Sequence, residues 1–257
     1  MSLHLDIVIS SLGHIFIVNK PYLMNQDNKE YCESNLFNGL NGHSLISPIE
    51  SVSNLVEPKI RLGILASGNG SNFEFIIKSI QNNELNAEVS ILIVNNPNCL
   101  VIEKAIKYDI PYVIINHRDC NSRLEHDKLV MNKLEELSVE LVVMAGWMRI
   151  VGEEIINKFN NRLINIHPSL LPSFKGIDAI QQAMDKRVTI TGCTVHYVQK
   201  EVDSGSIIIQ AAVPLKEKDS IETLKKRIQD MEHIILPLAI SKVAIEIRTR
   251  FKDKKAS

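Results

Sequence analysis

The sequence carries almost no net charge and has no long apolar run. In its 257 residues, 29 Lys and Arg stand against 30 Asp and Glu, which leaves a formal net charge of −1. Nucleic-acid-binding proteins usually show a basic excess, so this balance gives no reason to expect a nucleic-acid partner. A membrane-spanning helix needs about 20 apolar residues in succession. No run in this sequence approaches that length, so no membrane partner is expected.

Cysteine is also scarce. The four cysteines are far apart and form no CxxC pair; they are Cys32, Cys99, Cys120 and Cys193. Such spacing excludes a disulfide framework and a zinc site of paired cysteines, so we expect free thiols, no bound metal and a cytoplasmic protein. Residues 1–18 are apolar, but they lack a basic segment and include Asp6, so a secretory signal is not expected.

A change in composition near residue 60 divides the chain. Residues 1–58 are predicted to be a poorly ordered N-terminal extension, because residues 19–58 are rich in Asn, Ser and Gly and show no periodicity. Met24 is an alternative position at which translation could start. Residues 59–250 are predicted to form the main domain, followed by a C-terminal tail at 251–257. Alternating apolar residues near the N-terminus could form one strand; they are Leu3, Leu5, Ile7 and Ile9.

From Arg61 onward, short apolar runs alternate with amphipathic segments. This alternation predicts an α/β fold with an open, mostly parallel, Rossmann-like sheet and helices on both faces. The expected strands are apolar on both sides, as a sheet covered on both faces requires. Strands are expected at residues 61–67, 87–96, 110–116, 139–146 and 162–166, and helices at 71–83, 99–109, 122–138 and 152–159.

The C-terminal half has a different pattern. Residues 191–198 and 206–215 are predicted to form two strands that pair antiparallel at one edge of the sheet. A last helix is expected from Asp219, because Asp219 and Glu222 have the spacing of a capping box. Pro237 is expected to kink or interrupt this helix.

A glycine-rich loop, "SGNGSN" at residues 67–72, follows the first strand and opens the first helix. Its glycines allow a tight turn, and Ser71 and Asn72 could cap the helix. Backbone N–H groups at a helix N-terminus bind phosphate or carboxylate. Phe73 stands where a dinucleotide loop needs a third glycine, and the lysine of a triphosphate-binding loop is absent. The loop favours a single phosphate, and a well-capped tight turn is the alternative.

The segment "NIHPSLLP" at residues 165–172 ends a strand at the edge where open parallel sheets bind ligands. Asn165 and His167 are two residues apart, so their side chains point to the same side of the strand. Together they could hold a developing oxyanion. Pro168 then removes a donor and ends the ladder. The alternative is a histidine whose hydrogen bonds are satisfied within a turn.

The turn "EVDSGSI" separates the two late strands. Asp203 could be a carboxylate partner that keeps the His167 imidazole charged, and Glu201 is the rival for that position. Turn chemistry alone would also explain an aspartate beside Ser and Gly. Sequence spacing leaves the choice open.

Two further motifs are candidates for ligand binding. In "MAGWMRIV", Trp147 beside Arg149 suits a planar anionic ligand, although Trp147 could equally cap the core and Arg149 could be a surface charge. In "MEHIILP", Glu232 and His233 lie in the middle of the last helix, where a solvated face is the alternative.

These segments, in this order, resemble the phosphoribosylglycinamide formyltransferase family, the folate-dependent enzymes of purine synthesis that formylate glycinamide ribonucleotide (GAR). The resemblance covers roughly residues 60–245. It rests on six motifs found in register: "SGNGSN", "AGWMRI", "NIHPSLLPSFKG", "GCTVHYV", "DSGSIIIQ" and "EHIILP".

The resemblance implies that residues 59–250 form a formyltransferase domain that uses 10-formyltetrahydrofolate and GAR as substrates and needs no metal. Asn165 and protonated His167 would stabilise the oxyanion, and Asp203 would keep His167 charged. The resemblance also implies two sets of binding residues. GAR would contact Gly70, Ser71, Asn72 and Glu232, and the folate would contact Arg123, Met148, Arg149, Ile150, Val151 and Asn165.

Other families remain as alternatives at this point. Formyltetrahydrofolate hydrolases and methionyl-tRNA formyltransferases share an Asn-x-His and a later Asp. The hydrolase is expected to carry a regulatory domain in front and the tRNA enzyme an RNA-binding domain behind, and neither is expected to have a phosphate-type "SGNGSN" loop. Two alternatives belong to other functional classes: a catalytically inactive nucleotide-binding module and a dehydrogenase.

Overall fold

The structure, a computed structural model, describes residues 6–9, 15–18, 45–48 and 57–256. It divides into two units, Met1–Gly42 and His43–Ser257. In the first unit, strand β1 (Asp6–Ile9) pairs antiparallel with β2 (Ile15–Val18), so the described part holds two strands where one was expected. The loop expected over residues 19–58 lies outside the described residues except at 45–48 and 57–58.

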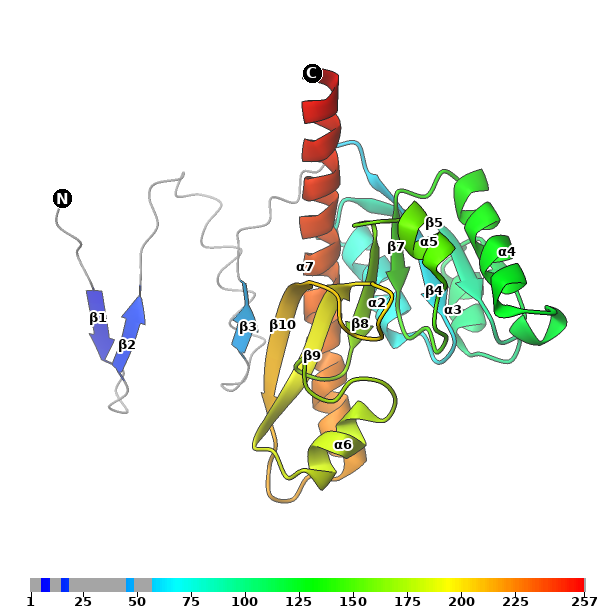
Figure 1. The fold of residues 1–257 in the computed structure, drawn as a ribbon. Coiled ribbons are helices and arrows are strands. Elements are labelled where there is room, and N and C mark those ends of the chain that lie inside the picture. The colour runs from blue at the N-terminus through cyan, green and yellow to red at the C-terminus, as the bar shows by residue number, and fades with distance from the viewer. Residues whose placement is uncertain (1–5, 10–14, 19–44, 49–56, 257) are drawn as a thin grey trace. The chain divides into compact units, whose positions relative to one another are not determined.

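The second unit is built on one sheet of eight strands in the order β3-β10-β9-β8-β7-β4-β5-β6 (Figure 1). Its strands are β3 (Leu45–Ser47), β4 (Ile60–Ala66), β5 (Ala87–Val94), β6 (Tyr112–Ile114), β7 (Leu141–Met144), β8 (Leu163–His167), β9 (Ile190–Tyr197) and β10 (Ile207–Pro214). Its helices are α2 (Ser71–Gln81), α3 (Val101–Lys107), α4 (Arg123–Glu136), α5 (Glu153–Lys158), α6 (Ala179–Asp185) and α7 (Ile221–Ala256), with a short 3-10 helix η2 (His117–Asp119).

The sheet changes character at β8. Strands β6, β5, β4, β7 and β8 run parallel, whereas β9 pairs antiparallel with β8 and β10 antiparallel with β9. The predicted fold class, a mostly parallel sheet with an antiparallel edge in the C-terminal half, is therefore confirmed. The outermost strand β3 also pairs antiparallel with β10 and comes from within residues 1–58. The division of the chain at residue 58 stays a prediction.

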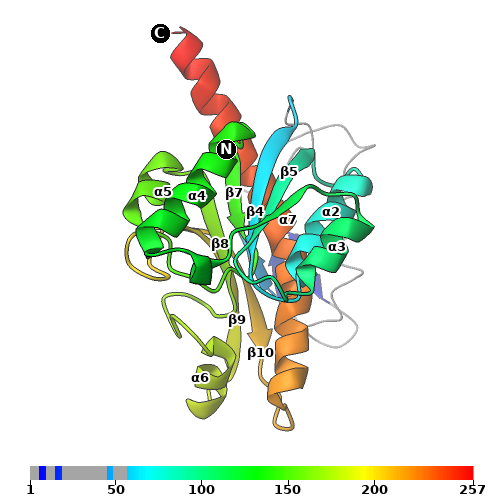
Figure 2. The same ribbon diagram turned by 90° about the vertical axis from the view of Figure 1, so that its right-hand side faces the viewer.

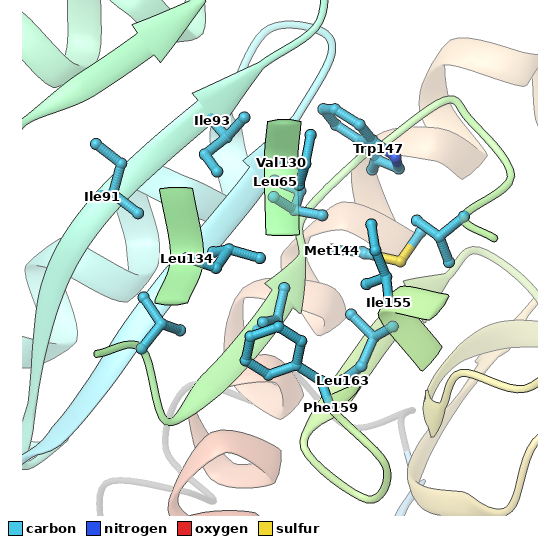
Figure 3. Packing of buried hydrophobic residues seen from close by; sticks show 13 residues of the cluster. Leu65, Ile91, Ile93, Val130, Leu134, Met144, Trp147, Ile155, Phe159 and Leu163 are labelled. Carbon is cyan, nitrogen blue, oxygen red and sulfur yellow. The ribbon is translucent and has the colours of Figure 1, made fainter. Parts of the chain in front are cut away.

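Helices cover both faces of the sheet. Helices α4 and α5 lie on one face, and α2, α3 and α7 lie on the other (Figure 2). Under α4 and α5, a cluster of buried side chains fills the space between helices and strands (Figure 3). Phe159, at the end of α5, is 2% exposed and lies beside Leu163 of β8 in this cluster. The apolar strand residues that predicted a covered sheet thus supply its core.

Three expectations about the C-terminal half need correction. Helix α7 runs without a break through Pro237, because the residues around the proline are buried against β9 and β10, and this packing outweighs one lost hydrogen bond. Asp219 does not form a capping box with Glu222; its carboxylate binds Arg227, Thr223 and the backbone N–H of Lys216. The seven-residue helix α6 was not expected, because no element was predicted between residues 177 and 190.

The topology brings several loops to the carboxyl edge of the parallel strands. The loops after β4 and β7 are joined there, because the Ser67 N–H donates to the Gly146 carbonyl at 3.0 Å and the Met148 N–H donates to Ser67 Oγ at 2.9 Å. This edge is where open α/β sheets bind ligands. None of the described helices has the length and apolarity that a membrane span requires.

Replacing Phe159 by Ala should destabilise the protein by about 3–5 kcal/mol, because it leaves a cavity in the cluster under α5. Urea unfolding measures this change. Ile106→Ala is the control: Ile106 is 64% exposed on α3, so its truncation should change stability by no more than about 0.5 kcal/mol. Equal effects of the two substitutions would show that Phe159 is not part of the core.

Candidate active site

A cleft of about 940 Å³ opens at the carboxyl ends of β4, β7 and β8. Segments of the loops after these three strands line it, together with the β9–β10 turn and one face of α7. Arg123, the first residue of α4, is not among the lining residues. His233, which the sequence also singled out, is not among them either. The other residues assigned to catalysis or to a substrate do line the cleft, namely Gly70, Ser71, Asn72, Met148, Arg149, Ile150, Val151, Asn165, His167, Asp203 and Glu232.

The glycine-rich loop forms one end of the cleft. Gly70 adopts the left-handed conformation with φ 69°, and a Cβ there would lie 2.3 Å from Val101 Cγ2, so only glycine fits. The carbonyl of Gly70 accepts the first hydrogen bond of α2, from the Glu74 N–H. The backbone N–H groups of the first turn have no acceptor within the helix, so they are available to an anion in the cleft.

The predicted side-chain cap of α2 is wrong. Gly70 occupies the cap position, and neither Ser71 nor Asn72 makes a capping hydrogen bond. The Asn72 side chain donates instead to Glu232 Oε2 at 2.9 Å, which joins α2 to α7 across 160 residues of sequence. Residues that looked like a cap are thus directed into the cleft.

Glu232 is a buried carboxyl, 7% exposed, on the face of α7 that lines the cleft. Burial raises its pKa to about 7, against the hydrogen bond from Asn72 and the charge of Lys225, which lower it. Because one ligand with a positive charge could supply the missing counter-charge, this carboxyl can bind an amine or accept hydrogen bonds from hydroxyl groups.

Two neighbours of Glu232 on α7 were missed by the sequence analysis. Lys225 and Gln229 also line the cleft, and they lie on the same helix face at intervals of four and three residues. This helical spacing, once Glu232 was a candidate, was a signal that could have found them. Lys225 adds a positive charge to the end of the cleft that holds the glycine-rich loop.

Asn165 and His167 lie on β8, beside the antiparallel strand β9. The register partner of Asn165 is His196, and that of His167 is Thr194. The His167 ring is 5% exposed. Its Nε2 lies 2.8 Å from the Phe174 carbonyl oxygen, and its Nδ1 lies 3.3 Å from Asp203 Oδ2. Both ring nitrogens therefore face an acceptor oxygen.

Asp203 is the carboxylate at this histidine, and the rival Glu201 is not. It has a left-handed backbone with φ 49°, a conformation that Asp tolerates better than most residues. Burial acts to raise its pKa, but the hydrogen bond from His196, the Gly176 N–H at 2.8 Å and the charge of His167 outweigh burial and lower it. Asp203 is therefore ionised throughout the neutral pH range.

His196 is a third member of this network that the sequence analysis did not single out. Its ring is 2% exposed, and its Nε2 lies 3.5 Å from Asp203 Oδ1 and 3.3 Å from Asn165 Nδ2. The Nδ1 lies 2.8 Å from the Tyr197 carbonyl oxygen. Only the strand pairing places His196 beside Asn165, so the motif "GCTVHYV" by itself gave no reason to choose it.

The segment after β7 forms another part of the cleft wall. Trp147 is 7% exposed and packs in the core, whereas Met148 and Ile150 are 78% and 55% exposed toward solvent. The segment is anchored at its far end, because the Gly152 N–H donates to the buried Asp127 carboxylate at 2.7 Å. Arg149 carries a buried Nε that has no hydrogen-bond partner within the described residues.

The described residues contain no group of three His, Cys, Asp or Glu side chains with a geometry suited to a metal ion. Cys99, Cys120 and Cys193 are free in the structure, and Cys32 lies outside the described part.

Comparison with known families agrees with this geometry. The pattern of the formyl transferase family matches residues 60–240, which include the cleft and most of the sheet. The chain belongs to the formyl transferase family. Trifunctional purine biosynthetic protein adenosine-3 of Homo sapiens is 44% identical to this chain over 186 residues, which are 72% of this chain and 18% of the human protein. The chain thus spans less than a fifth of that relative.

Relatives of similar length are also known. Phosphoribosylglycinamide formyltransferase of Bacillus subtilis (strain 168) is 37% identical to this chain over 183 residues, which are 71% of this chain and 94% of the Bacillus protein. The crystal structure of phosphoribosylglycinamide formyltransferase from Bacillus halodurans superposes with a TM-score of 0.69 and 40% identity. It covers 71% of this chain and 94% of its own. The crystal structure of glycinamide ribonucleotide transformylase 1 from Symbiobacterium toebii superposes with a TM-score of 0.72 and 37% identity. The match covers 77% of this chain and 94% of the Symbiobacterium chain.

Replacing Glu232 by Gln should flatten the dependence of stability on pH. A carboxyl with a raised folded-state pKa binds its proton more tightly when folded, so the parent loses stability as pH rises from the unfolded value of about 4.3 to about 7. The variant cannot ionise, so it should match the parent near pH 4.5 and exceed its stability by on the order of 3 kcal/mol at pH 8. Urea unfolding at both pH values checks this; the same difference at both would contradict it.

Proposed function

We propose that this formyl transferase transfers the formyl group of 10-formyltetrahydrofolate to the amine of GAR, giving formyl-GAR in purine biosynthesis. The observation that carries the proposal is the meeting of Asn165, His167 and Asp203 between a phosphate-type loop and an apolar wall of one cleft. We propose further that the reaction takes place in the cytoplasm, with these two small molecules as substrates and no metal.

GAR has an anionic phosphate at one end and an amine at the other, and one end of the cleft supports binding of both. The first-turn N–H groups of α2, with Ser71 and Lys225, would bind the phosphate. Glu232 would then ionise and accept hydrogen bonds from GAR. Since its burial raises the pKa of Glu232 to about 7, binding a positively charged or donating group there is favourable at neutral pH.

The folate would occupy the other end, against the segment after β7. The exposed apolar side chains of Met148 and Ile150 offer contact area to a planar ring system, and the unpartnered Nε of Arg149 offers a donor to the carboxylate of the folate tail. The residues present therefore fit this co-substrate. Arg123, which the resemblance also assigned to the folate, stays a prediction.

The catalytic trio would act on the tetrahedral intermediate. Attack of the GAR amine on the formyl carbon gives an oxyanion and a positively charged nitrogen. Asn165 Nδ2 would donate to the oxyanion, and so would the Nδ1–H of His167, which it would share with Asp203 Oδ2 at 3.3 Å; the Nε2 contact with Phe174 holds the ring for this. Asp203 would accept the proton of the new ammonium through a water and return it to N10 of the folate, after which the C–N10 bond breaks.

Two other reactions are alternatives: hydrolysis of 10-formyltetrahydrofolate and formylation of an aminoacylated tRNA. The phosphate-type loop, with Lys225 and Glu232 at the same end of the cleft, favours a small amine that carries a phosphate. A direct assay separates these possibilities: formate and formyl-GAR are measured with 10-formyltetrahydrofolate in the presence and absence of GAR. Formyl-GAR formed at the rate of folate consumption supports the proposal, and formate release that GAR does not affect refutes it.

Replacing Asp203 by Asn should lower kcat by about 10²-fold or more at neutral pH, because the substitution removes both the counter-charge of His167 and the proton acceptor. The loss should shrink at lower pH, where His167 is protonated without a carboxylate partner. Glu201→Gln, two residues away in the same turn, is the matched control and should leave kcat within a few fold. A pH–rate profile of the Asn variant with the shape of the parent profile would contradict this role.

Replacing Ser71 and Asn72 together by Ala should raise the KM for GAR at least about tenfold and the KM for the folate far less, because both side chains lie at the phosphate end of the cleft. Arg149→Ala is the reciprocal variant and should raise mainly the folate KM. Steady-state kinetics with each substrate varied in turn tests both. Equal effects on the two KM values would argue against the assignment of the two ends.

A further inference from the structure

The loop after β8, residues 168–176, contacts His167 and Asp203 through its backbone. The Phe174 carbonyl oxygen lies 2.8 Å from His167 Nε2, and the Gly176 N–H donates to Asp203 Oδ2 at 2.8 Å. Because a carbonyl oxygen only accepts, the first contact is a hydrogen bond donated by Nε2. The orientation of the imidazole therefore depends on where the loop holds the carbonyl group of Phe174.

Phe174 has an unfavourable backbone conformation. Its φ is 55°, in the left-handed region that residues other than glycine rarely adopt. A conformation of this kind persists only where the surrounding contacts enforce it. One such contact lies within the loop, where Ser169 Oγ donates at 2.6 Å to the carbonyl of Ser173, the residue before Phe174. The position of Ser169 therefore bears on the position of Phe174.

Thr194 of β9 anchors the loop to the sheet. Its side chain is 0% exposed, and its hydroxyl donates to the Ser169 carbonyl at 2.7 Å and accepts from the Leu171 N–H at 3.1 Å. The same hydroxyl also accepts from Gln210 Nε2 at 2.9 Å. A hydroxyl group has one donor and two acceptor positions, so all the hydrogen-bonding capacity of this one is used.

Gln210 lies one strand further from β8, on β10, as the register partner of Thr194 (Figure 1). Its Nε2 donates to the Leu171 carbonyl at 3.0 Å as well as to Thr194 Oγ1, so both protons of the amide nitrogen are used. Neither Gln210 nor Thr194 lines the cleft. Both side chains therefore act on the loop and not on a substrate in the cleft.

We propose that Thr194 and Gln210 are positioning residues for the reaction. They hold the loop after β8 so that the Phe174 carbonyl keeps the His167 ring turned with Nδ1 toward Asp203. Without either anchor, Phe174 would relax from its left-handed conformation and the imidazole would lose its fixed orientation. A displacement of about 1 Å, caused by a substitution away from the reacting groups, can lower a rate about 10²-fold. The inference rests on the proposed function, in which His167 donates to the oxyanion.

Two substitutions by side chains of similar size test this role. Thr194→Val removes the hydroxyl, and Gln210→Met removes the amide. Each should lower kcat about tenfold or more and leave the KM values for GAR and the folate within about threefold of the parent values, because both residues lie outside the cleft. Thr194→Ser keeps the hydroxyl and should restore most of kcat. Steady-state kinetics with each substrate varied in turn measures these effects.

Tyr197→Phe is the matched control. It removes a hydroxyl from the same strand, β9, whose hydrogen bond at 2.7 Å goes to Glu246 of α7 and not to the loop. Its kcat should stay close to the parent value even where Tm falls. A parent-like kcat in both Thr194→Val and Gln210→Met, or an equal loss in Tyr197→Phe, would overturn the proposal. So would a Thr194→Ser variant as slow as Thr194→Val, because the hydroxyl would then not be the group that matters.

A measurement without substrates separates this inference from the proposed function. Proton NMR follows the exchange with water of the His167 Nε2 proton, identified by its absence in His167→Asn. Thr194→Val and Gln210→Met should speed this exchange about tenfold or more, because the hydrogen bond to Phe174 protects the proton. Unchanged exchange in both variants would overturn the inference. Accelerated exchange in the variants, with no formyl-GAR formed by the parent enzyme, would overturn the proposed function alone.

Discussion

The candidate site depends on the carboxylate of Asp203, on which three separate segments converge. His167 from β8, His196 from β9 and the Gly176 N–H from the loop after β8 all contact it. Ion contacts and hydrogen bonds of this kind fix the loop and the turn against each other, because removing the carboxylate would leave buried donors unpaired. They also keep Asp203 ionised in a half-buried position, as the proposed proton relay requires.

Glu232 is a second buried carboxyl in the cleft, and its pKa is shifted in the opposite direction. Burial raises the pKa of Glu232 to about 7, whereas the contacts of Asp203 lower its pKa. The two carboxyls stand in one cleft, and their environments give them different protonation at neutral pH. This difference suits the two roles proposed above, in which Asp203 holds charge beside the reacting atoms and Glu232 gains charge when a substrate binds.

Much of the architecture followed from local pattern. The alternation of apolar runs and amphipathic segments predicted the parallel part of the sheet, its helices and the antiparallel edge. It could do so because the repeat of buried side chains in a strand or a helix follows from local backbone geometry. Pro237 and the cap of α2 were predicted wrongly for a related reason. Helix α7 continues through its proline because the residues just before and just after it are buried against strands distant in the sequence. The Asn72 side chain does not cap its own helix and donates to Glu232, 160 residues further along the chain.

The sequence by itself determined the fold class, the family resemblance and a set of candidate residues of which all but Arg123 and His233 line the cleft, since glycine loops, strand-end motifs and helix faces are local features. Tertiary structure alone decided that Asp203 and not Glu201 contacts His167, and that His196 lies beside Asn165. These facts depend on strand register and on the distance between segments far apart in the chain. Spacing along the sequence does not encode either one.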